Sequence, residues 1–394
     1  MTTSRHKVSG GAGPTFSELF TPKLVTVLRE GYGAPQLRAD LVAGLTVAIV
    51  ALPLSMAIAI ASGVSPDRGL FTAIVGGFIV SMLGGSRFQI GGPAGAFIVL
   101  VAATVERHGV DGLLLATLMA GIFLAAIGYL RLGTYIKFIP YPVTVGFTAG
   151  IAVIIFSSQI VELLGLKLAG KEPGPLVPKL EAIAAAIGTL NPSAVAVAAI
   201  TIVSILVLRR VRPGWPGMLI AVGLAALVTA ALALPVETIG TRYGRIPALP
   251  PLSLDKVLAV LPDAVAFALL GAIESLLSAV VADGMTGRRH RSNCELVAQG
   301  FANVASALFG GICVTGTIAR TATNVRAGAH GPVSGMAHSV FLLGFMLVAA
   351  PLAGYIPLAA LAGVLAVVAW NMVEKQAFAT LLKSSRGDAL VLLV

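Results

Sequence analysis

Two stretches decide the fold that this sequence predicts: Ile90-Gly91-Gly92-Pro93-Ala94-Gly95-Ala96-Phe97 and Gly310-Gly311-Ile312-Cys313-Val314-Thr315-Gly316-Thr317-Ile318-Ala319-Arg320. Each places glycine, proline and small polar residues inside a long apolar run. In a bilayer, irregular backbone is tolerated only where it is packed in protein or lines a wet cavity. Paired interruptions of this kind are typical of the binding site of a secondary transporter. We therefore expect two half-helices that begin inside the membrane and meet at one buried polar site.

The composition predicts an all-α, polytopic membrane protein. Hydrophobic residues make up 57% of the chain and charged residues only 11%, and the mean hydropathy is +0.95. Soluble domains carry about 25% charged residues. A membrane-spanning helix needs about 20 mostly apolar residues. Uninterrupted apolar runs lie at 41–61, 69–83, 113–130, 143–164, 193–208, 218–234, 264–281, 296–309, 333–353 and 358–370, and the run 389–394 is expected to begin a thirteenth segment, in which the chain ends.

The order of these runs predicts two inverted repeats of seven segments each. Seven apolar elements precede a proline-rich connection, with the third interrupted, and the same order then begins again. An odd number of spans makes the second repeat enter the membrane from the opposite face. The expected division is a cytoplasmic N-terminal segment at 1–39, the first repeat at 40–235, an extracytoplasmic connection at 236–262 and an incomplete second repeat at 263–394.

The positive charge reports topology rather than a nucleic-acid ligand. The net charge is +10, and most Lys and Arg residues fall on one face when the N-terminus is placed in the cytoplasm, as the positive-inside rule requires. The N-terminal region has no cleavable signal peptide pattern. We expect a multi-pass protein of the cell inner membrane. Cys294 and Cys313 provide neither a disulfide framework nor a metal-ligand spacing, so no cofactor or metal is expected.

The two interruptions predict a site for a small anion. Pro93 follows two glycines, and proline is well suited to the first turn of a helix, so the first half-helix is expected to begin there. The segment Thr315-Gly316-Thr317 would begin the second half-helix in the same way. Each helix N-terminus carries about half a positive elementary charge. The alternative is that glycine and proline here only permit close helix packing.

Arg320 lies one turn beyond Thr317 in an apolar segment. An intramembrane arginine is energetically costly, which makes a functional role the first hypothesis. It would raise the potential at an anion site or hold a carboxylate. The alternative is that its side chain extends along the apolar surface to reach water.

Glu274 and Ser278 predict an ion-coupling site. Glu274 is the sole ionisable residue between Asp263 and Asp283, and Ser278 lies four residues later on the same helical face. Burial favours the protonated form of a carboxyl group, which makes proton symport natural. A sodium ion bound between Glu274 and Ser278 is one alternative, and a structural salt bridge to Arg320 is another.

The sequence resembles the sulfate permease (SulP) family of anion transporters from about Asp40 to Val394. The motifs that carry the resemblance are Leu52-Pro53-Leu54-Ser55-Met56-Ala57, Pro66-Asp67-Arg68-Gly69-Leu70-Phe71, Gly91-Gly92-Pro93-Ala94-Gly95, Glu274-Ser275-Leu276-Leu277-Ser278, Val281-Ala282-Asp283 and Ala319-Arg320-Thr321. The resemblance implies a core domain of helices 1–4 and 8–11, a gate domain of helices 5–7 and 12–14, and a homodimer. The residues that it places around the anion are Pro93, Ala94, Gly95, Ala96, Gly316, Thr317, Ile318 and Arg320, with Leu54 and Ile58 in the pocket wall.

Three departures from the family pattern refine this expectation. The sodium-dependent bicarbonate branch has aspartate at the place of Glu274 and threonines at the places of Ser278 and Ile318, so the resemblance favours a proton here. Many animal members carry glutamine at the place of Leu54. Family members normally end in a cytoplasmic STAS domain, for which this sequence has no residues, so it is expected to be an incomplete or shortened form.

The leading hypothesis is a proton-coupled symporter of a small anion, of the sulfate, bicarbonate or fumarate class, that works by alternating access. The alternatives are a sodium-coupled bicarbonate transporter and an anion channel or exchanger. An enzyme is not expected, because no nucleophile, metal set or acid/base pair lies near the interruptions.

Overall fold

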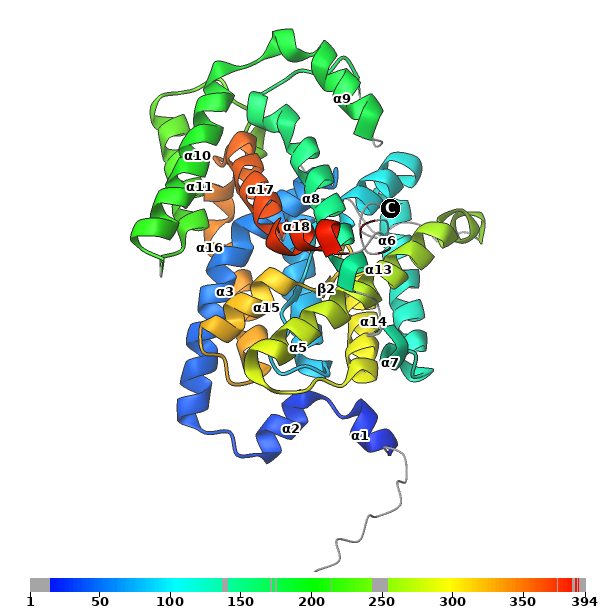
Figure 1. Ribbon diagram of the computed structural model, residues 1–394. Helices are drawn as coiled ribbons and strands as arrows, with labels where there is room; N and C mark the ends of the chain where they lie inside the picture. Colours follow the sequence, from blue (N-terminus) through cyan, green and yellow to red (C-terminus); the bar gives the residue numbers. More distant parts are fainter. Residues whose placement is uncertain are drawn as a thin grey trace, which may run out of the picture.

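Helices, most of them apolar, make up most of the computed structural model (Figure 1). It describes residues 15–136, 141–170, 172–173, 176–213, 215–242, 254–373, 375–384, 387 and 389. In these residues, six helical segments are long and apolar enough to cross a membrane: Ala34–Ala61, Pro66–Leu83, Gly95–Tyr129, Pro192–Val211, Asp255–Thr286 and Leu358–Lys383. Shorter apolar helices cover Thr148–Leu164, Gly217–Ala231 and Val333–Val348. The expected helix at 389–394 lies outside the described residues apart from position 389.

The elements follow the order predicted for two inverted repeats. Those that precede the connection are α1 (Phe16–Phe20), α2 (Lys23–Arg29), α3 (Ala34–Ala61), α4 (Pro66–Phe71), the π-helical turn η1 (Thr72–Gly76), α5 (Gly77–Leu83), β1 (Gly91–Gly92), the 3-10 turn η2 (Gly95–Phe97), α6 (Ile98–Tyr129), α7 (Gly133–Ile136), α8 (Tyr141–Leu164), α9 (Leu176–Ala185), the 3-10 turn η3 (Ile187–Thr189), α10 (Pro192–Val211), α11 (Gly217–Ala231) and α12 (Ile239–Arg242). Those that follow it are α13 (Leu254–Thr286), α14 (Ser292–Leu308), β2 (Thr315–Gly316), α15 (Ile318–Arg326), α16 (Val333–Ala353), α17 (Leu358–Met372) and α18 (Lys375–Ser384).

The long helix α6 is two helices joined end to end. Gly109 has φ 69° and ψ −177°, a left-handed conformation that glycine adopts without a steric penalty. The first part of α6 therefore completes the interrupted third segment, and the second part is the fourth segment expected at 113–130.

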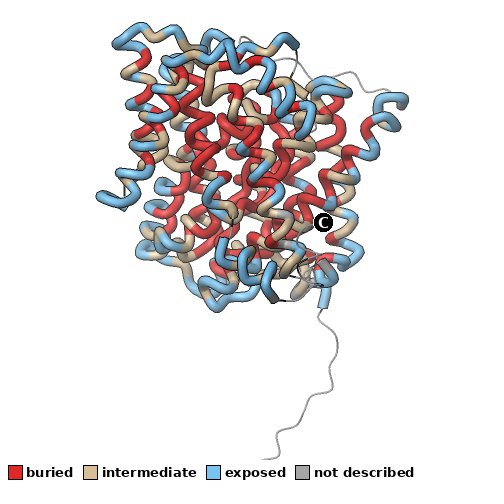
Figure 2. The backbone as a smooth tube through the Cα atoms, turned by 45° about the horizontal axis from the view of Figure 1, so that its top comes forward, coloured by how far each residue is buried: buried red, intermediate tan, exposed pale blue. Residues whose placement is uncertain are grey.

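The helices form two groups. The core contains α3, α5, α6 and α13 to α16, which pack mainly on one another, and the gate contains α8, α10, α11 and α17. In Figure 1, α10, α11 and α17 lie at the upper left, and α5, α13 and α14 lie below and to the right of them. Figure 2 shows a continuous buried centre with exposed residues around it.

Glycine allows two core helices to approach closely. A Cβ atom on Gly300 of α14 would lie 2.6 Å from the backbone nitrogen of Ala125 in α6, and one on Gly121 of α6 would lie 2.7 Å from the Gly300 carbonyl oxygen. Small residues of this kind bring helix backbones together where lipid provides no hydrophobic driving force between helices. The contact fixes the fourth segment against the ninth.

A two-stranded sheet joins the two interruptions at the centre of the core. Strands β1 and β2 pair antiparallel, with Gly91 opposite Gly316 and Gly92 opposite Thr315. Antiparallel pairing is the direction that inverted repeats impose on equivalent segments. The lead-in to each half-helix is therefore hydrogen-bonded to the other, and the two helix starts lie side by side.

The expected start of the first half-helix at Pro93 is wrong by two residues. Pro93 and Ala94 lie outside any helix, Ala94 being extended with φ −115° and ψ 145°, and the helix begins with the 3-10 turn at Gly95. Pairing of β1 with β2 holds the chain extended up to this point, and this long-range constraint overrides the local preference of proline for a first helical turn.

Candidate anion site

The site is built around the N-termini of η2 and α15. Their N-cap residues, Ala94 and Thr317, are both extended, and neither side chain caps the helix that follows. Thr317 instead donates to the Ile90 carbonyl oxygen twice, from its backbone nitrogen at 2.9 Å and from its hydroxyl at 3.1 Å. The N–H groups of a first helical turn have no intrahelical acceptor. The two starts therefore present uncapped donors and positive partial charge side by side.

Arg320 lies behind the first strand and points into the protein. It is 1% exposed, and its Nη2 donates to Ser55 Oγ at 3.1 Å and to the Pro93 carbonyl oxygen at 3.5 Å. Within the described residues, Nε and Nη1 have no hydrogen-bond partner and no carboxylate forms an ion pair with the side chain. The alternative in which Arg320 extends toward the surface is therefore wrong. A buried charge without a partner is costly, and an anion at the neighbouring helix starts would compensate it.

Glu274 lies on the face of α13 that contacts β2 and α15. Three hydrogen bonds mark that face: Thr315 Oγ1 to the Gly271 carbonyl at 3.1 Å, Gln89 Nε2 to Ser275 Oγ at 2.9 Å, and Ser278 Oγ to Thr321 Oγ1 at 3.0 Å. Residues three and four apart share one side of a helix, which places Glu274 among Gly271, Ser275 and Ser278.

The Glu274 carboxyl group has no partner in this part of the chain. It is 5% exposed, and no hydrogen bond or ion pair reaches it from the described residues. The expected alternative of a salt bridge to Arg320 is not formed. The described residues also contain no group of three or more His, Cys, Asp or Glu side chains that could hold a metal ion.

The pocket-wall residues of α3 and the first half-helix belong to one apolar cluster. Leu54, Ile58, Ala94 and Ala96 are all buried in it. Gly95 faces the gate, since a Cβ atom there would lie 2.8 Å from Cδ1 of Ile155 in α8 and 3.9 Å from the sulfur of Met372 at the end of α17. The helix starts are thus covered by gate side chains, and Ala94, Ala96 and Thr317 are 7%, 6% and 8% exposed.

The structure adds residues to the site that the sequence interpretation missed. Ser55 receives the Arg320 hydrogen bond, and Gln89 connects α13 to the loop before β1. Asn303 of α14 holds the second interruption, because its side chain donates to the Val314 carbonyl at 2.7 Å and accepts from the Val314 nitrogen at 3.0 Å. These three residues share a feature that the sequence shows: each is a polar residue in or next to an apolar run. Each forms its hydrogen bond with the other repeat or with an interruption.

Comparisons with known proteins agree with this architecture. Residues 37–394 match the model of the sulfate permease family. The chain is 47% identical over 371 residues to the putative sulfate transporter YvdB of Bacillus subtilis, covering 92% of this chain and 70% of that protein. It superposes on the transmembrane domain of a cyanobacterium bicarbonate transporter BicA with a TM-score of 0.83 and 32% identity, over 92% of this chain and 95% of that one.

A more distant structure shares the fold alone. Murine Slc26a9, an anion transporter in the inward-facing state, superposes with a TM-score of 0.86 at 17% identity, over 99% of this chain and 69% of that one. The expected fold of two inverted seven-segment repeats with core and gate is confirmed. The chain belongs to the sulfate permease family, whose members are anion transporters of the membrane.

Proposed function

We propose that this protein is a secondary transporter that takes up a small anion together with a proton by alternating access. The observation that carries the proposal is the meeting of two uncapped helix starts in front of a buried Arg320 that lacks an ionic partner within the described chain. The anion would complete an arrangement that otherwise leaves positive charge uncompensated.

Backbone N–H groups would hold the anion. Gly95 and Ala96 in the first half-helix and Ile318 in the second provide them, while Ala94, Gly316 and Thr317 shape the space between. Pro93 has no N–H group, so its role is to position Arg320 through its carbonyl oxygen. Arg320 acts through the field of its charge, since its side chain is buried against Gly92 of β1.

Glu274 would carry the proton. An ionised carboxylate on the α13 face beside β2 would repel the anion, and protonation removes that charge. Glu274 is buried and has no ion-pair partner among the described residues, and burial without a partner favours a protonated carboxyl group over a carboxylate that binds sodium.

Movement of the core against the gate would expose the site to either side. Gly95 faces Ile155 and Met372 of the gate, so a displacement of the core would separate these residues and open the helix starts. We place the N-terminus and 1–39 in the cytoplasm, the repeats at 40–235 and 263–394 in the cell inner membrane, and the connection at 236–262 outside. We also propose a homodimer.

The substrates to test first are sulfate and bicarbonate, because the relatives are named for them, with fumarate as the dicarboxylate. Purified protein in liposomes is given an inward proton gradient, and uptake of each labelled anion is compared with and without the gradient. We expect gradient-driven accumulation by the wild type and none by Glu274→Gln, while the matched surface variant Glu181→Gln, at an exposed position of α9, retains it. Equal uptake without a gradient, together with a fully active Glu274→Gln, would exclude proton coupling, and ion flow far above about 10³ per second would indicate a channel.

A further inference from the structure

A second carboxyl group is buried in the core, on α14. Glu295, in the first turn of α14, is 0% exposed. Its Oε1 accepts from Gln89 Nε2 at 2.8 Å and from Gln299 Nε2 at 3.1 Å, and its Oε2 accepts from the Ser86 nitrogen at 2.9 Å. No Lys, Arg or His from the described ranges forms an ion pair with it.

Gln89 connects this carboxyl group to the anion site. Its Nε2, which donates to Glu295, lies 2.0 Å from the position that a Cβ atom on Gly316 would take. Gly316 is the residue of β2 that pairs with Gly91, and it immediately precedes Thr317. One amide group therefore hydrogen-bonds to Glu295 and also packs against the backbone of Gly316, just before the second half-helix starts.

The two side-chain amides that donate to Glu295 also carry oxygens that could accept a hydrogen bond from its protonated form. Gln89 Oε1 and Gln299 Oε1 are buried and have no partner in the described part of the molecule. Rotation of either amide by 180° exchanges its oxygen and nitrogen. A protonated Glu295 could then donate its O–H to an amide oxygen, whereas the ionised form accepts the N–H groups seen here.

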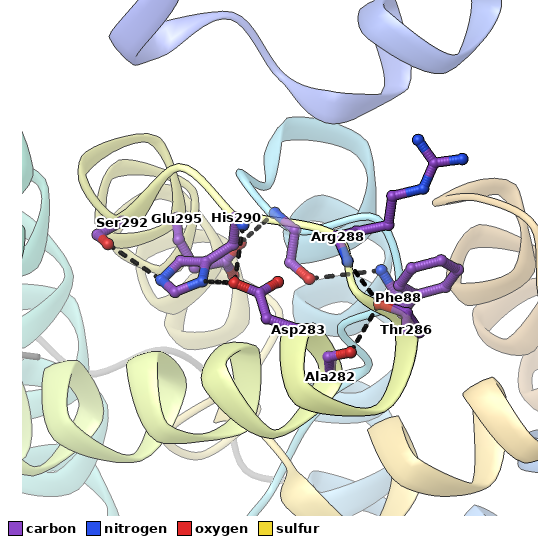
Figure 3. A network of polar contacts seen from close by, with 9 residues as sticks. Phe88, Ala282, Asp283, Thr286, Arg288, His290, Ser292 and Glu295 are labelled. Atoms are coloured by element: carbon purple, nitrogen blue, oxygen red, sulfur yellow. Dashed lines mark hydrogen bonds and ion pairs between the residues drawn. The ribbon is translucent and has the colours of Figure 1, made fainter.

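The charges near Glu295 set which state prevails. Figure 3 shows His290 between Asp283 and Ser292, with Glu295 on the adjoining turn of α14, and His290 contacts Asp283 through Nδ1 at 2.7 Å and Ser292 through Nε2 at 3.0 Å. The ionisable groups around this end of α14 are Lys23, Glu30, Arg87, Asp283, His290 and Arg291. Complete burial opposes the ionised form of Glu295, and positive groups nearby offset part of that effect. A bound anion adds negative charge and favours protonation.

We infer that Glu295 is a second proton-binding carboxyl group of the core, and that its protonation is linked to anion binding through Gln89 and Gly316. The inference rests on the proposed anion site; only the second part of the expected signal below, the part lost in Glu274→Gln, rests on the assignment of Glu274. By reciprocity, a proton on Glu295 raises the affinity for the anion by the same factor by which the anion raises the affinity for the proton.

Infrared difference spectroscopy of the purified full chain tests this directly. The carbonyl stretch of protonated carboxyl groups is recorded during acidification and then on addition of sulfate, for wild type, Glu295→Gln and Glu274→Gln. We expect a sulfate-induced band with two parts, one lost in each variant. The sulfate dissociation constant, measured by calorimetry, should rise about tenfold per pH unit for each proton taken up, hence about a hundredfold for wild type and tenfold for either variant.

Two matched variants test the connection itself. Gln89→Met and Gln299→Met each remove one hydrogen bond to Glu295 Oε1. Gln89 alone also donates to Ser275 and lies against Gly316. We expect Gln89→Met to keep the acidification band of Glu295 and lose its response to sulfate, and Gln299→Met to keep both.

The outcomes separate the two proposals. If Glu295→Gln leaves the acidification band unchanged, Glu295 does not bind a proton and the inference is wrong. If the band is present but wild-type protein binds sulfate without changing it, the linkage is wrong. If wild type binds no sulfate while the Glu295 band titrates normally, Glu295 does bind a proton, and sulfate is rejected as a substrate in the proposed function.

Discussion

Gly92 of β1 lies directly against the guanidinium group of Arg320: a Cβ atom at Gly92 would come 2.2 Å from Nη1. Because Arg320 is 1% exposed and held by Ser55 and the Pro93 carbonyl, the glycine leaves just enough space for the charge behind the strand.

Gly92→Ala is therefore expected to displace Arg320 and weaken anion binding, by about tenfold or more, while the protein still folds. The physical reason is that Nη1 must move and buried space is scarce. The measurement is the apparent KM for anion uptake in liposomes. Gly344→Ala on α16 is the matched control, since its Cβ atom would meet nothing within 4 Å. An unchanged KM in Gly92→Ala would show that the position of Arg320 is unimportant for binding.

Arg320→Met should lose anion binding without destabilising the protein in the absence of anion. Removing a buried, uncompensated charge relieves its desolvation cost, whereas losing one partner of a buried charged contact costs about 2–5 kcal/mol. Thermal unfolding with and without sulfate or bicarbonate checks both parts. We expect an equal or higher Tm without anion and no rise in Tm on its addition. A lower Tm with a normal anion response would instead assign Arg320 a structural role.

Transport should not depend on sodium. The Ser278 hydroxyl donates to Thr321 Oγ1 at 3.0 Å, and Thr321 Oγ1 also accepts from the Ile90 nitrogen at 3.1 Å, so Thr321 Oγ1 already accepts two hydrogen bonds. Replacing sodium by potassium at constant pH should leave uptake unchanged. Ser278→Ala should cost about 1 kcal/mol of stability, the value of one hydrogen bond, with proton-driven uptake retained. Uptake that stops in potassium would support the sodium-coupled alternative.

The contact between Glu30 and Arg87 should contribute stability that depends on pH. The Arg87 guanidinium donates a hydrogen bond to Glu30 and lowers the pKa of that carboxyl group below its usual 4.5. Because the pKa is lower in the folded state, the contribution is present above pH 4.5 and is lost as the pH falls through the folded-state value. The Tm difference between wild type and Glu30→Gln should therefore be larger at pH 7 than at pH 4. A constant difference would mean that the ion pair contributes nothing.

The interruptions, Arg320 and Glu274 could be predicted because each is a local exception to an apolar pattern. Glycine, proline and single charged residues stand out in such a sequence, and the cost of burying them points to a function. The predicted helix start at Pro93 was wrong because β1, which precedes Pro93, pairs with β2, more than 200 positions later in the chain. This pairing keeps the chain extended as far as Ala94.

The partners of the polar residues could not be predicted. Gln89 and Glu295 come from segments that meet only after both repeats have folded, and helical periodicity contains no information about such distant contacts. The same holds for Asn303, whose side chain satisfies the backbone of Val314. A single sequence shows which residues are unusual, but the three-dimensional fold decides which of them meet.

The pairing of Gly91 with Gly316 also sets a rule for selectivity. Hydrogen bonds between β1 and β2 fix the spacing of the two half-helices, and both strands belong to the core. If the core moves as one body, the anion site moves together with the bound anion and keeps the same dimensions on either side of the membrane. The protein should then discriminate among anions by size equally well at both faces, and differences in apparent affinity between the faces would report protonation rather than shape.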